Sequence, residues 1–336
     1  MKKIMVIGGP GNISSSTLDD LVSRGYSVGL FSRAGSRFDE VDPKVKVFPG
    51  ERDDPEALKT AFDNFQPDIV LDMACFLPKH ADQIANLING RVEQFVFVST
   101  VDVYGYPLTS LPFKETDVWR KNANSEYAEN KRKCEQVFKN KAEKGDLPLT
   151  IVRPGYSFSK RFIISALSRS AARDILYRLQ NNMPLLVPGD GRTLIHVSSG
   201  YNTGRMVATL AGNEKAIGNE YTLASPSAME YSDYLRLFAG ALDKEPVLVN
   251  IPSQLILSLK HPDLEGNLLE ELAQYNLSFS IDRFLADCSG FEFEPLEIAA
   301  RRLVRWNFAN GLVEYKPNID DRIIEVYTQF TGKISL

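Results

Sequence analysis

The chain has 336 residues, 43% of them hydrophobic and 24% charged, with a formal net charge of −4 at pH 7. This composition is that of a globular protein with a large core, and its mild acidity excludes the overall positive field that draws proteins to nucleic acids or anionic membranes. Cys75, Cys134 and Cys288 are odd in number and far apart, so they form neither a disulfide framework nor a metal-binding pattern. We expect a reduced, cytoplasmic setting and no bound metal.

No segment of the sequence has the length of a membrane span. Two lysines precede an apolar run at the start of the chain, but that run is about five residues long and stops at glycines, too short for a signal peptide. Nowhere does an apolar stretch approach the roughly 20 residues that a transmembrane helix needs. We therefore expect a soluble protein whose first apolar run is a buried strand.

The first half of the chain alternates apolar runs with segments of helical periodicity. We expect strands at residues 3–7, 28–31, 45–48, 69–73, 95–99 and 149–152. We expect helices at 14–24, 55–65 and about 125–144, and further helices at 200–210 and 232–242. The strand segments are continuously apolar, as in parallel sheets covered on both faces, so the pattern predicts a doubly wound α/β sheet.

The alternation becomes irregular after Gly155. We expect the doubly wound domain to span residues 1–156, with the chain returning to it around residues 193–222. Residues 157–192 and 223–336 are expected to form a smaller mixed region packed on that domain. The sequence contains no long linker, low-complexity tract or internal repeat.

The turn after the first strand is rich in glycine. Residues 7–14 read IGGPGNIS, with Gly8 and Gly11 directly after the strand and directly before the first helix. Glycine permits the sharp turn and lets a pyrophosphate approach the N–H groups at the helix N-terminus, which is how dinucleotides are bound. Ser14 takes the place of a third glycine and is small enough for close packing. The alternative is an ordinary glycine turn between a strand and a helix.

The residues after the second strand bear on the choice of cofactor. Sites selective for NAD usually place Asp or Glu about 20 residues past the glycines, where it binds the ribose hydroxyls. This chain has Ser32 and Arg33 there, and a hydroxyl beside a guanidinium suits a 2′-phosphate. We therefore predict NADP, with NAD as the alternative. The competing interpretation is that Arg33 stacks on the adenine or lies in solvent.

A tyrosine and a lysine four residues apart, Tyr127 and Lys131, lie in the segment expected to form the long helix. They project from the same helix face, so the ammonium can favour the ionised phenol that a tyrosine needs to act as a base. Thr100 follows a strand, at the edge where open α/β sheets bind ligands. The alternative is that the pair lies on an exposed amphipathic helix face. The position of the pair after the glycine turn and Thr100 in the sequence favours a catalytic role.

Several segments together resemble the extended short-chain dehydrogenase/reductase family, of the NAD-dependent epimerase/dehydratase type. The matching segments are the glycine turn, Gly50 to Asp53, Phe97 to Gly105, Tyr127 to Lys131, Val152 to Gly155, and Gly189 to Gly191 followed by His196 and Val197. They occur in family order over residues 1 to about 200, and the resemblance fades beyond about residue 225. It implies a Rossmann domain that binds NAD(P) and a smaller substrate-binding region.

The resemblance also implies roles for individual residues. Tyr127 would be the acid/base that moves the proton of a substrate hydroxyl, Lys131 would lower the pKa of Tyr127 and bind the nicotinamide ribose, and Thr100 would hydrogen-bond the reacting oxygen. The remaining cofactor contacts implied are Gly8, Gly11, Asn12 and Ile13 along the pyrophosphate, Glu51 and Arg52 near the adenine, and Ala74 beside the cofactor.

Departures from the family pattern limit the choice of reaction. Sugar 4,6-dehydratases carry two adjacent acids after the threonine, whereas this chain has Val101 and then Asp102, which argues against 4,6-dehydration. Tyr156 stands where nucleotide-sugar enzymes commonly have an asparagine. The expected substrate contacts are Thr100, Asp102, Tyr156 and Arg192, the last of which suits a diphosphate. His196 is expected to be structural.

The leading hypothesis is therefore an NAD(P)-dependent epimerase or reductase acting on a sugar or nucleotide-sugar. The alternative is an NADPH-dependent ketone or aldehyde reductase for a small molecule that carries no nucleotide. A non-catalytic RNA-binding relative is disfavoured, because the catalytic set is intact and the basic residues that follow Lys131 alternate with acidic ones. We expect a small-molecule substrate and no nucleic-acid or membrane partner. A homodimer that packs through the Tyr127 helix is the assembly the resemblance implies.

Overall fold

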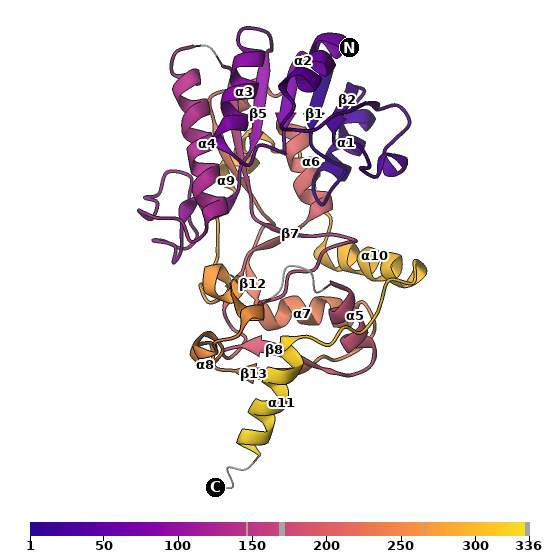
Figure 1. Ribbon diagram of the computed structural model, residues 1–336, viewed down its shortest axis with the longest axis vertical. Coiled ribbons are helices and arrows are strands. Elements are labelled where there is room, and N and C mark those ends of the chain that lie inside the picture. Colours follow the sequence, from indigo (N-terminus) through magenta and orange to yellow (C-terminus); the bar gives the residue numbers. More distant parts are fainter. Residues whose placement is uncertain (146, 168–171, 266, 333–336) are drawn as a thin grey trace.

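The computed structural model describes residues 1–145, 147–167, 172–265 and 267–332 (Figure 1). Its upper part in Figure 1 is a seven-stranded parallel sheet, in the order β11-β6-β5-β4-β1-β2-β3. The strands are β1 (Lys3–Ile7), β2 (Ser27–Ser32), β3 (Lys46–Pro49), β4 (Ile69–Asp72), β5 (Gln94–Val98), β6 (Leu149–Pro154) and β11 (Glu220–Leu223). The predicted doubly wound α/β fold is confirmed.

Helices cover both faces of this sheet, and each strand alternates its side chains between them. Along β1, Ile4 and Val6 are buried on one face, and Met5 and Ile7 on the other. One face is covered by α1 (Ser14–Ser23), α6 (Gly200–Leu210) and α9 (Asp282–Asp287), and the opposite face by α2 (Pro55–Phe65), α3 (Pro78–Ile88) and α4 (Glu126–Ala142). The sheet therefore has an apolar layer on each face. The edge at the carboxyl ends of its strands, where such sheets bind ligands, is formed by loops.

The helix α3 was not predicted from the sequence, although its pattern is regular. Pro78 stands at the start of the helix, where a missing N–H costs little. Ala81, Ile84, Ala85 and Ile88 follow at helical spacing and are buried against the sheet. Two of these four apolar residues are alanines, so the hydrophobic signal is weak even though the periodicity is correct.

Two glycines let α6 pack unusually close to α1. A Cβ on Gly200 would lie 2.1 Å from the carbonyl oxygen of Asn12, and one on Gly204 would lie 2.5 Å from that of Ile13. Two hydroxyls of α1 donate hydrogen bonds across this close contact. Ser16 donates to the carbonyl oxygen of Gly200 at 3.0 Å, and Thr17 donates to that of Gly204 at 3.1 Å. The contact holds the start of α1, and with it the glycine turn, against a segment about 190 residues later.

Most of the remaining described residues form a second, mixed region below the sheet in Figure 1, with its own apolar core. It contains three two-stranded sheets, which pair β7 (Tyr156–Phe158) with β10 (Val197–Ser199), β9 (Leu194–Ile195) with β12 (Met229–Glu230), and β8 (Pro184–Pro188) with β13 (Val247–Ile251). Its α-helices are α5 (Ala172–Gln180), α7 (Tyr231–Gly240), α8 (Ser253–Ser258), α10 (Leu296–Ala309) and α11 (Ile319–Thr331). Of the helices described, none is long and apolar enough to cross a membrane.

We expect Gly204→Ala to destabilise the protein by about 1–3 kcal/mol, because the added methyl group overpacks the contact between α1 and α6. Gly240→Ala is the matched control: Gly240 ends a helix, and its Cβ would meet no atom within 4 Å. Chemical denaturation of both variants measures the difference. Equal stability of the two variants would contradict the prediction.

Candidate active site

A groove of about 580 Å³ crosses the carboxyl ends of β1, β2 and β4. This is the edge at which open α/β sheets bind ligands. Nine of the ten residues predicted to contact the cofactor line it: Gly8, Gly11, Asn12, Ile13, Ser32, Arg33, Glu51, Arg52 and Ala74. The sequence motifs therefore converge on one continuous surface.

The glycine turn forms the middle of the groove. Gly8 has φ +94°, and a Cβ there would lie 2.7 Å from the Cβ of Ala74. Gly9 has φ +136°, and its Cβ would lie 2.6 Å from the Oγ of Ser14. The turn thus needs glycine both for its backbone conformation and for space, and it leads directly into the N-terminus of α1. A turn with this shape fits a pyrophosphate.

The side chain of Asn12 faces away from the groove. Its Nδ2 donates to the carbonyl oxygen of Ser157 at 3.3 Å, and its Oδ1 accepts a hydrogen bond from the hydroxyl of Ser159. Both ends of the amide are therefore used by β7 and the residue after it. What Asn12 offers to a ligand in the groove is its backbone.

At the end of the groove expected to hold the adenosine, Ser32 and Arg33 lie next to each other. The hydroxyl of Ser32 is buried and shares a hydrogen bond of 3.0 Å with that of Ser36. Arg33 is exposed and lines the groove. Arg37 donates to the carbonyl oxygen of Pro10 at 3.0 Å, so it ties the loop after β2 to the glycine turn.

Arg52 lies in the wall of the groove and is held by protein groups. It donates to the carboxylate of Asp72 at 2.8 Å and to Gln83 Oε1 at 3.0 Å. His80 Nε2 lies 3.0 Å from Asp53 Oδ1 in the same wall. Among the described residues, Arg52 Nε and His80 Nδ1 are buried and have no hydrogen-bond partner. Buried nitrogens of this kind are expected where a polar ligand completes the wall.

Lys131 lies just behind the other end of the groove. Its side chain is almost fully buried, and Nζ donates to the carbonyl oxygens of Val98 at 2.6 Å and Cys75 at 2.9 Å. An ammonium has three N–H groups, so these two carbonyls leave one for another partner. Burial lowers the pKa of Lys131, and the nearby charge of Asp72 opposes that shift.

Tyr127 stands one helical turn before Lys131 and is 37% exposed. Its ring centroid lies 6.4 Å from that of Phe76, which lines the groove. The Nζ of Lys131 lies 5.3 Å from the same Phe76 ring. Phe76 therefore contacts both predicted catalytic side chains and places them at one end of the groove.

The helix that carries this pair is fixed by buried charge. Arg153, in β6, donates to both carboxylate oxygens of Glu135 in α4, at 2.9 and 2.7 Å. Both side chains are almost fully buried, and such a forked pair sets distance and orientation together. The position of Tyr127 relative to the sheet thus depends on a contact two turns further along α4.

Three of the four predicted substrate residues form one hydrogen-bonded cluster. The carboxylate of Asp102 accepts hydrogen bonds from Thr100 at 3.2 Å, from Tyr106 at 2.9 Å and from Tyr156. Burial raises the pKa values of the Tyr106 and Tyr156 phenols, and the negative charge of Asp102 raises them further. Both phenols therefore stay protonated and act as donors to Asp102.

Arg192, the fourth predicted substrate residue, lies apart from this cluster. It is exposed on the turn after β8, and its Nε pairs with Glu230 at 3.2 Å. His196 has both ring nitrogens engaged: Nδ1 accepts from the backbone N–H of Phe279, and Nε2 lies 2.8 Å from the carbonyl oxygen of Ser225. Burial lowers the pKa of His196, so it is a neutral structural bridge.

Four residues of the site were not identified from the sequence. Phe76 and His80 line the groove, Asp72 holds Arg52, and Tyr106 completes the Asp102 cluster. Tyr106 directly follows the matched segment Phe97 to Gly105, and Asp72 ends an otherwise apolar strand, so both offered a signal. His80 lies on the helix that was missed.

Comparison with known protein families identifies the family of the chain. The sequence model of the NAD dependent epimerase/dehydratase family matches residues 4–198, more than half of the chain. No curated protein matches the chain by sequence.

Solved structures share the fold over most of their length. An epimerase from Methanothermobacter thermautotrophicus superposes with a TM-score of 0.74 at 18% identity, over 92% of this chain and 93% of its own. The dTDP-glucose 4,6-dehydratase of Bacillus anthracis, in complex with NAD, gives 0.72 at 14% identity, over 92% and 97%. The UDP-glucose 4-epimerase of Thermotoga maritima, with UDP-glucose, gives 0.70 at 18% identity, over 92% and 99%. At these identities the likeness establishes the fold.

We expect Gly8→Ala to raise the dissociation constant for a nicotinamide dinucleotide by about tenfold or more, equivalent to about 1.4 kcal/mol. The added methyl group would contact Ala74 at a backbone angle that alanine rarely adopts. Gly25→Ala is the control, because Gly25 has a similar φ of +83° with open space around it. Fluorescence titration gives both constants, and unchanged affinity in the Gly8 variant would separate the turn from cofactor binding.

Proposed function

The chain belongs to the NAD-dependent epimerase/dehydratase family, and we propose that it is an NAD(P)-dependent oxidoreductase acting on a hydroxyl or ketone carbon of a sugar or nucleotide-sugar. The observation that carries this proposal is the placement of Tyr127 and Lys131 around Phe76, at one end of the groove that the glycine turn crosses. Solved structures of this fold include a UDP-glucose epimerase and a dTDP-glucose dehydratase, which makes such sugars the first substrates to test.

Three residues of this chain would handle the proton. When bound, the nicotinamide accepts or supplies a hydride. Tyr127 takes the proton of the substrate hydroxyl during oxidation and returns it to the carbonyl oxygen during reduction. The ammonium of Lys131, one turn away on α4, favours the ionised phenol. In the structure the hydroxyl of Thr100 donates to the carboxylate of Asp102 at 3.2 Å. If the hydroxyl rotates away from Asp102, it can donate to the reacting oxygen instead.

Tyr127 is better suited to this role than the other two tyrosines near Thr100. Tyr106 and Tyr156 are buried donors to a carboxylate, and their raised pKa values keep the proton on each phenol. Tyr127 is partly exposed and shares its helix face with a lysine. The Asp102 cluster would then shape the substrate pocket rather than move the proton.

The same cluster disfavours a 4,6-dehydratase. That reaction needs a second acid next to Asp102, and Val101 there is a buried apolar residue. Asp102 itself is occupied by three hydroxyl donors. An epimerase or a net reductase therefore fits the site better.

The alternative is a net reductase that uses NADPH on a small molecule without a nucleotide. The exposed guanidinium of Arg33 beside Ser32 favours it, because the two would bind a 2′-phosphate. Identifying the nucleotide that copurifies with the protein separates the two functions. Tightly held NAD supports an epimerase, and an empty groove that binds NADPH supports the reductase.

We expect Tyr127→Phe to lower turnover by about 10²–10⁴-fold while leaving cofactor affinity nearly unchanged, because it removes the proton-transfer group alone. Turnover is followed on the best substrate from a panel of nucleotide-linked and free sugars. Tyr26→Phe is the control, since Tyr26 lies on the turn after α1 and contacts the backbone at Ala211. Full activity in the Tyr127 variant would refute the mechanism.

We expect Arg33→Ala to weaken NADPH binding by about tenfold and NADH binding by much less, because only NADPH carries the 2′-phosphate. Calorimetric titration of the wild type and the variant with both nucleotides gives the four constants. Equal losses for the two nucleotides would assign Arg33 to the adenine instead, and no loss would remove it from the cofactor site.

A further inference from the structure

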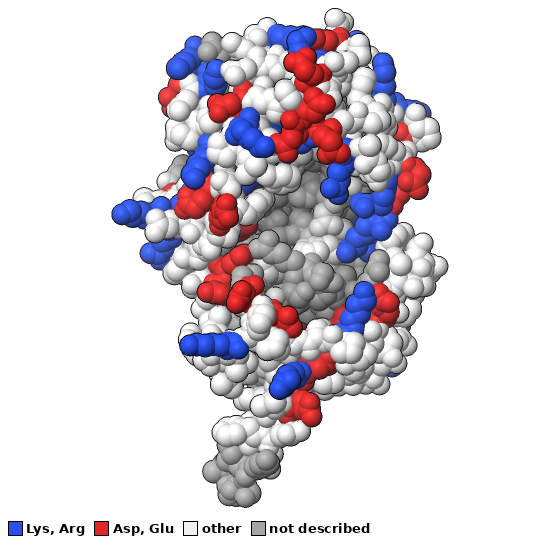
Figure 2. All heavy atoms as spheres, viewed as in Figure 1, with Lys and Arg blue, Asp and Glu red and all other residues white. Residues whose placement is uncertain are grey.

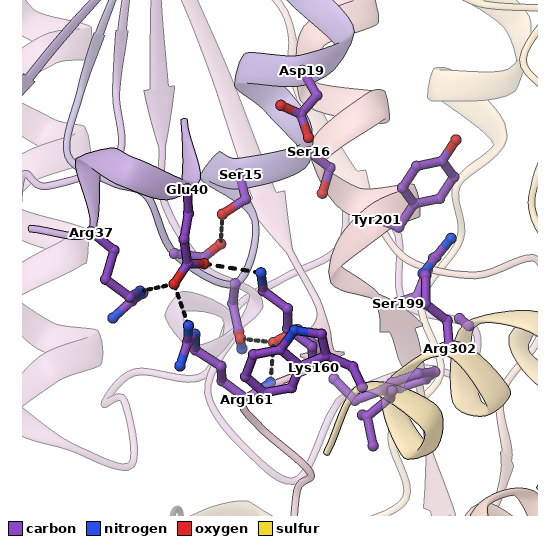
Figure 3. A pocket seen from close by; sticks show the side chains of 17 residues that line it. Ser15, Ser16, Asp19, Arg37, Glu40, Lys160, Arg161, Ser199, Tyr201 and Arg302 are labelled. Atoms are coloured by element: carbon purple, nitrogen blue, oxygen red, sulfur yellow. Dashed lines mark hydrogen bonds and ion pairs between the residues drawn. The ribbon is translucent and has the colours of Figure 1, made fainter. Parts of the chain in front are cut away.

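A second pocket, of about 480 Å³, lies next to the end of the glycine turn (Figure 3). Its walls come from α1, the segment after β2, the end of β7 and the residues after it, the start of α6, and α10. Gly11 and Asn12 line both pockets, and the side chain of Asn12 is hydrogen-bonded to Ser157 and Ser159. Thr100, Tyr127 and Lys131 are not among its lining residues, so it lies outside the proposed oxidoreductase site.

Positive side chains outnumber negative ones in the lining of this second pocket. Four cations face two carboxylates there, namely Arg37, Lys160, Arg161 and Arg302 against Asp19 and Glu40. In the surface view, Lys and Arg side chains gather at the right-hand edge of the molecule, at the level of α10 (Figure 2). Arg302 is paired with Glu294 outside the lining, which leaves three cations to consider.

Those three cations share one carboxylate. Glu40 accepts from Lys160 Nζ at 2.9 Å, lies 3.3 Å from Arg37 Nε, and also pairs with Arg161 (Figure 3). Burial alone would raise the pKa of Glu40, yet the hydrogen bond from Lys160 and the surrounding cations hold it below its ordinary value. A carboxylate brings one negative charge to a place where three positive charges converge. A phosphate brings more charge and more acceptor oxygens.

Packing holds two of the cations in place. Lys160 Nζ and the Arg161 guanidinium lie 5.2 and 4.8 Å from the centroid of the Trp306 ring. The carbonyl oxygen of Lys160 accepts a hydrogen bond of 2.7 Å from the buried amide of Asn307. The segment that carries both cations is thus anchored on α10, so the charges are positioned in advance of any ligand.

Two long helices begin at this pocket. Ser15 and Ser16 stand in the first turn of α1, and Ser199 caps α6, whose first turn includes Tyr201. The N-terminal end of a helix carries partial positive charge and attracts anions. The helix ends therefore add to a field that the side chains already make positive.

We propose that this second pocket binds a phosphate-bearing ligand, whose phosphate takes the place of the Glu40 carboxylate among Arg37, Lys160 and Arg161. The ligand would bind together with the dinucleotide, because the lining residues of the two pockets differ apart from Gly11 and Asn12. The proposal does not depend on the reaction that the groove performs.

The test uses the emission of Trp306. The chain has two tryptophans, so Trp119→Phe leaves Trp306 as the sole reporter. The protein is saturated with NAD⁺ to fill the groove and titrated with inorganic pyrophosphate and, separately, with UMP, at constant ionic strength. A saturable change with both probes indicates a site for phosphate groups, and a change with UMP alone indicates a nucleotide site. Calorimetry under the same conditions detects any binding that does not change the emission of Trp306.

Substitutions at two positions are expected to change the affinity for the phosphate ligand in opposite directions. Glu40→Gln should tighten binding several-fold, because it frees three cations from a competing carboxylate. Lys160→Gln combined with Arg161→Gln should weaken binding by about tenfold or more, while the remaining stems still cover Trp306. Arg205→Gln is the control, since this arginine contacts Tyr201 but does not line the pocket.

Three results would overturn the proposal. The first is the absence of saturable binding of either probe by both emission and calorimetry. The second is equal affinity in the wild type and the Lys160/Arg161 variant. The third is weaker binding after Glu40→Gln. None of these measurements uses turnover, so failure here is distinguishable from failure of the proposed oxidoreductase function.

Discussion

The groove depends on the lack of a side chain at Gly8 and Gly9, in the turn between β1 and α1. A Cβ at Gly8 would meet Ala74, one at Gly9 would meet Ser14, and on the outer side the Asn12 carbonyl is approached by Gly200. The backbone of the turn is therefore closely enclosed by its neighbours, and the N–H of Gly8 donates to the carbonyl oxygen of Phe31 at 2.8 Å. The groove and the second pocket both include residues of this turn.

Buried charge also fixes the helix that carries Tyr127 and Lys131, the residues proposed to be catalytic. Lys131 is neutralised by no carboxylate in direct contact among the described residues, and two backbone carbonyls hold its ammonium beside Phe76. The Arg153–Glu135 pair locks the same helix to β6. Tyr127 is partly exposed and its ring lies 6.4 Å from that of Phe76, so its position depends on residues that are themselves fixed.

The sheet and most of the groove could be predicted from the sequence, because continuous apolar runs mark buried parallel strands and ligands bind at their carboxyl ends. The features of the site that the sequence did not predict depend on contacts between residues far apart in the chain. The Asp102 cluster needs Tyr156, 54 residues later, and Asp72 meets Arg52 from a separate strand. Spacing along the chain carries no information about such pairs. The strand β11 was missed because it is a short segment far from the other strands in sequence.

Because α6 and β11 come late in the sequence, the first domain cannot be completed early in synthesis. The contact of α1 with Gly200 and Gly204, and the edge strand that pairs with β6, come from residues 200–223. While the first 156 residues are being synthesised, one apolar face of the sheet therefore lies partly uncovered. The domain can close only after its last strand has left the ribosome, so the nascent chain must keep that face from other partners until then.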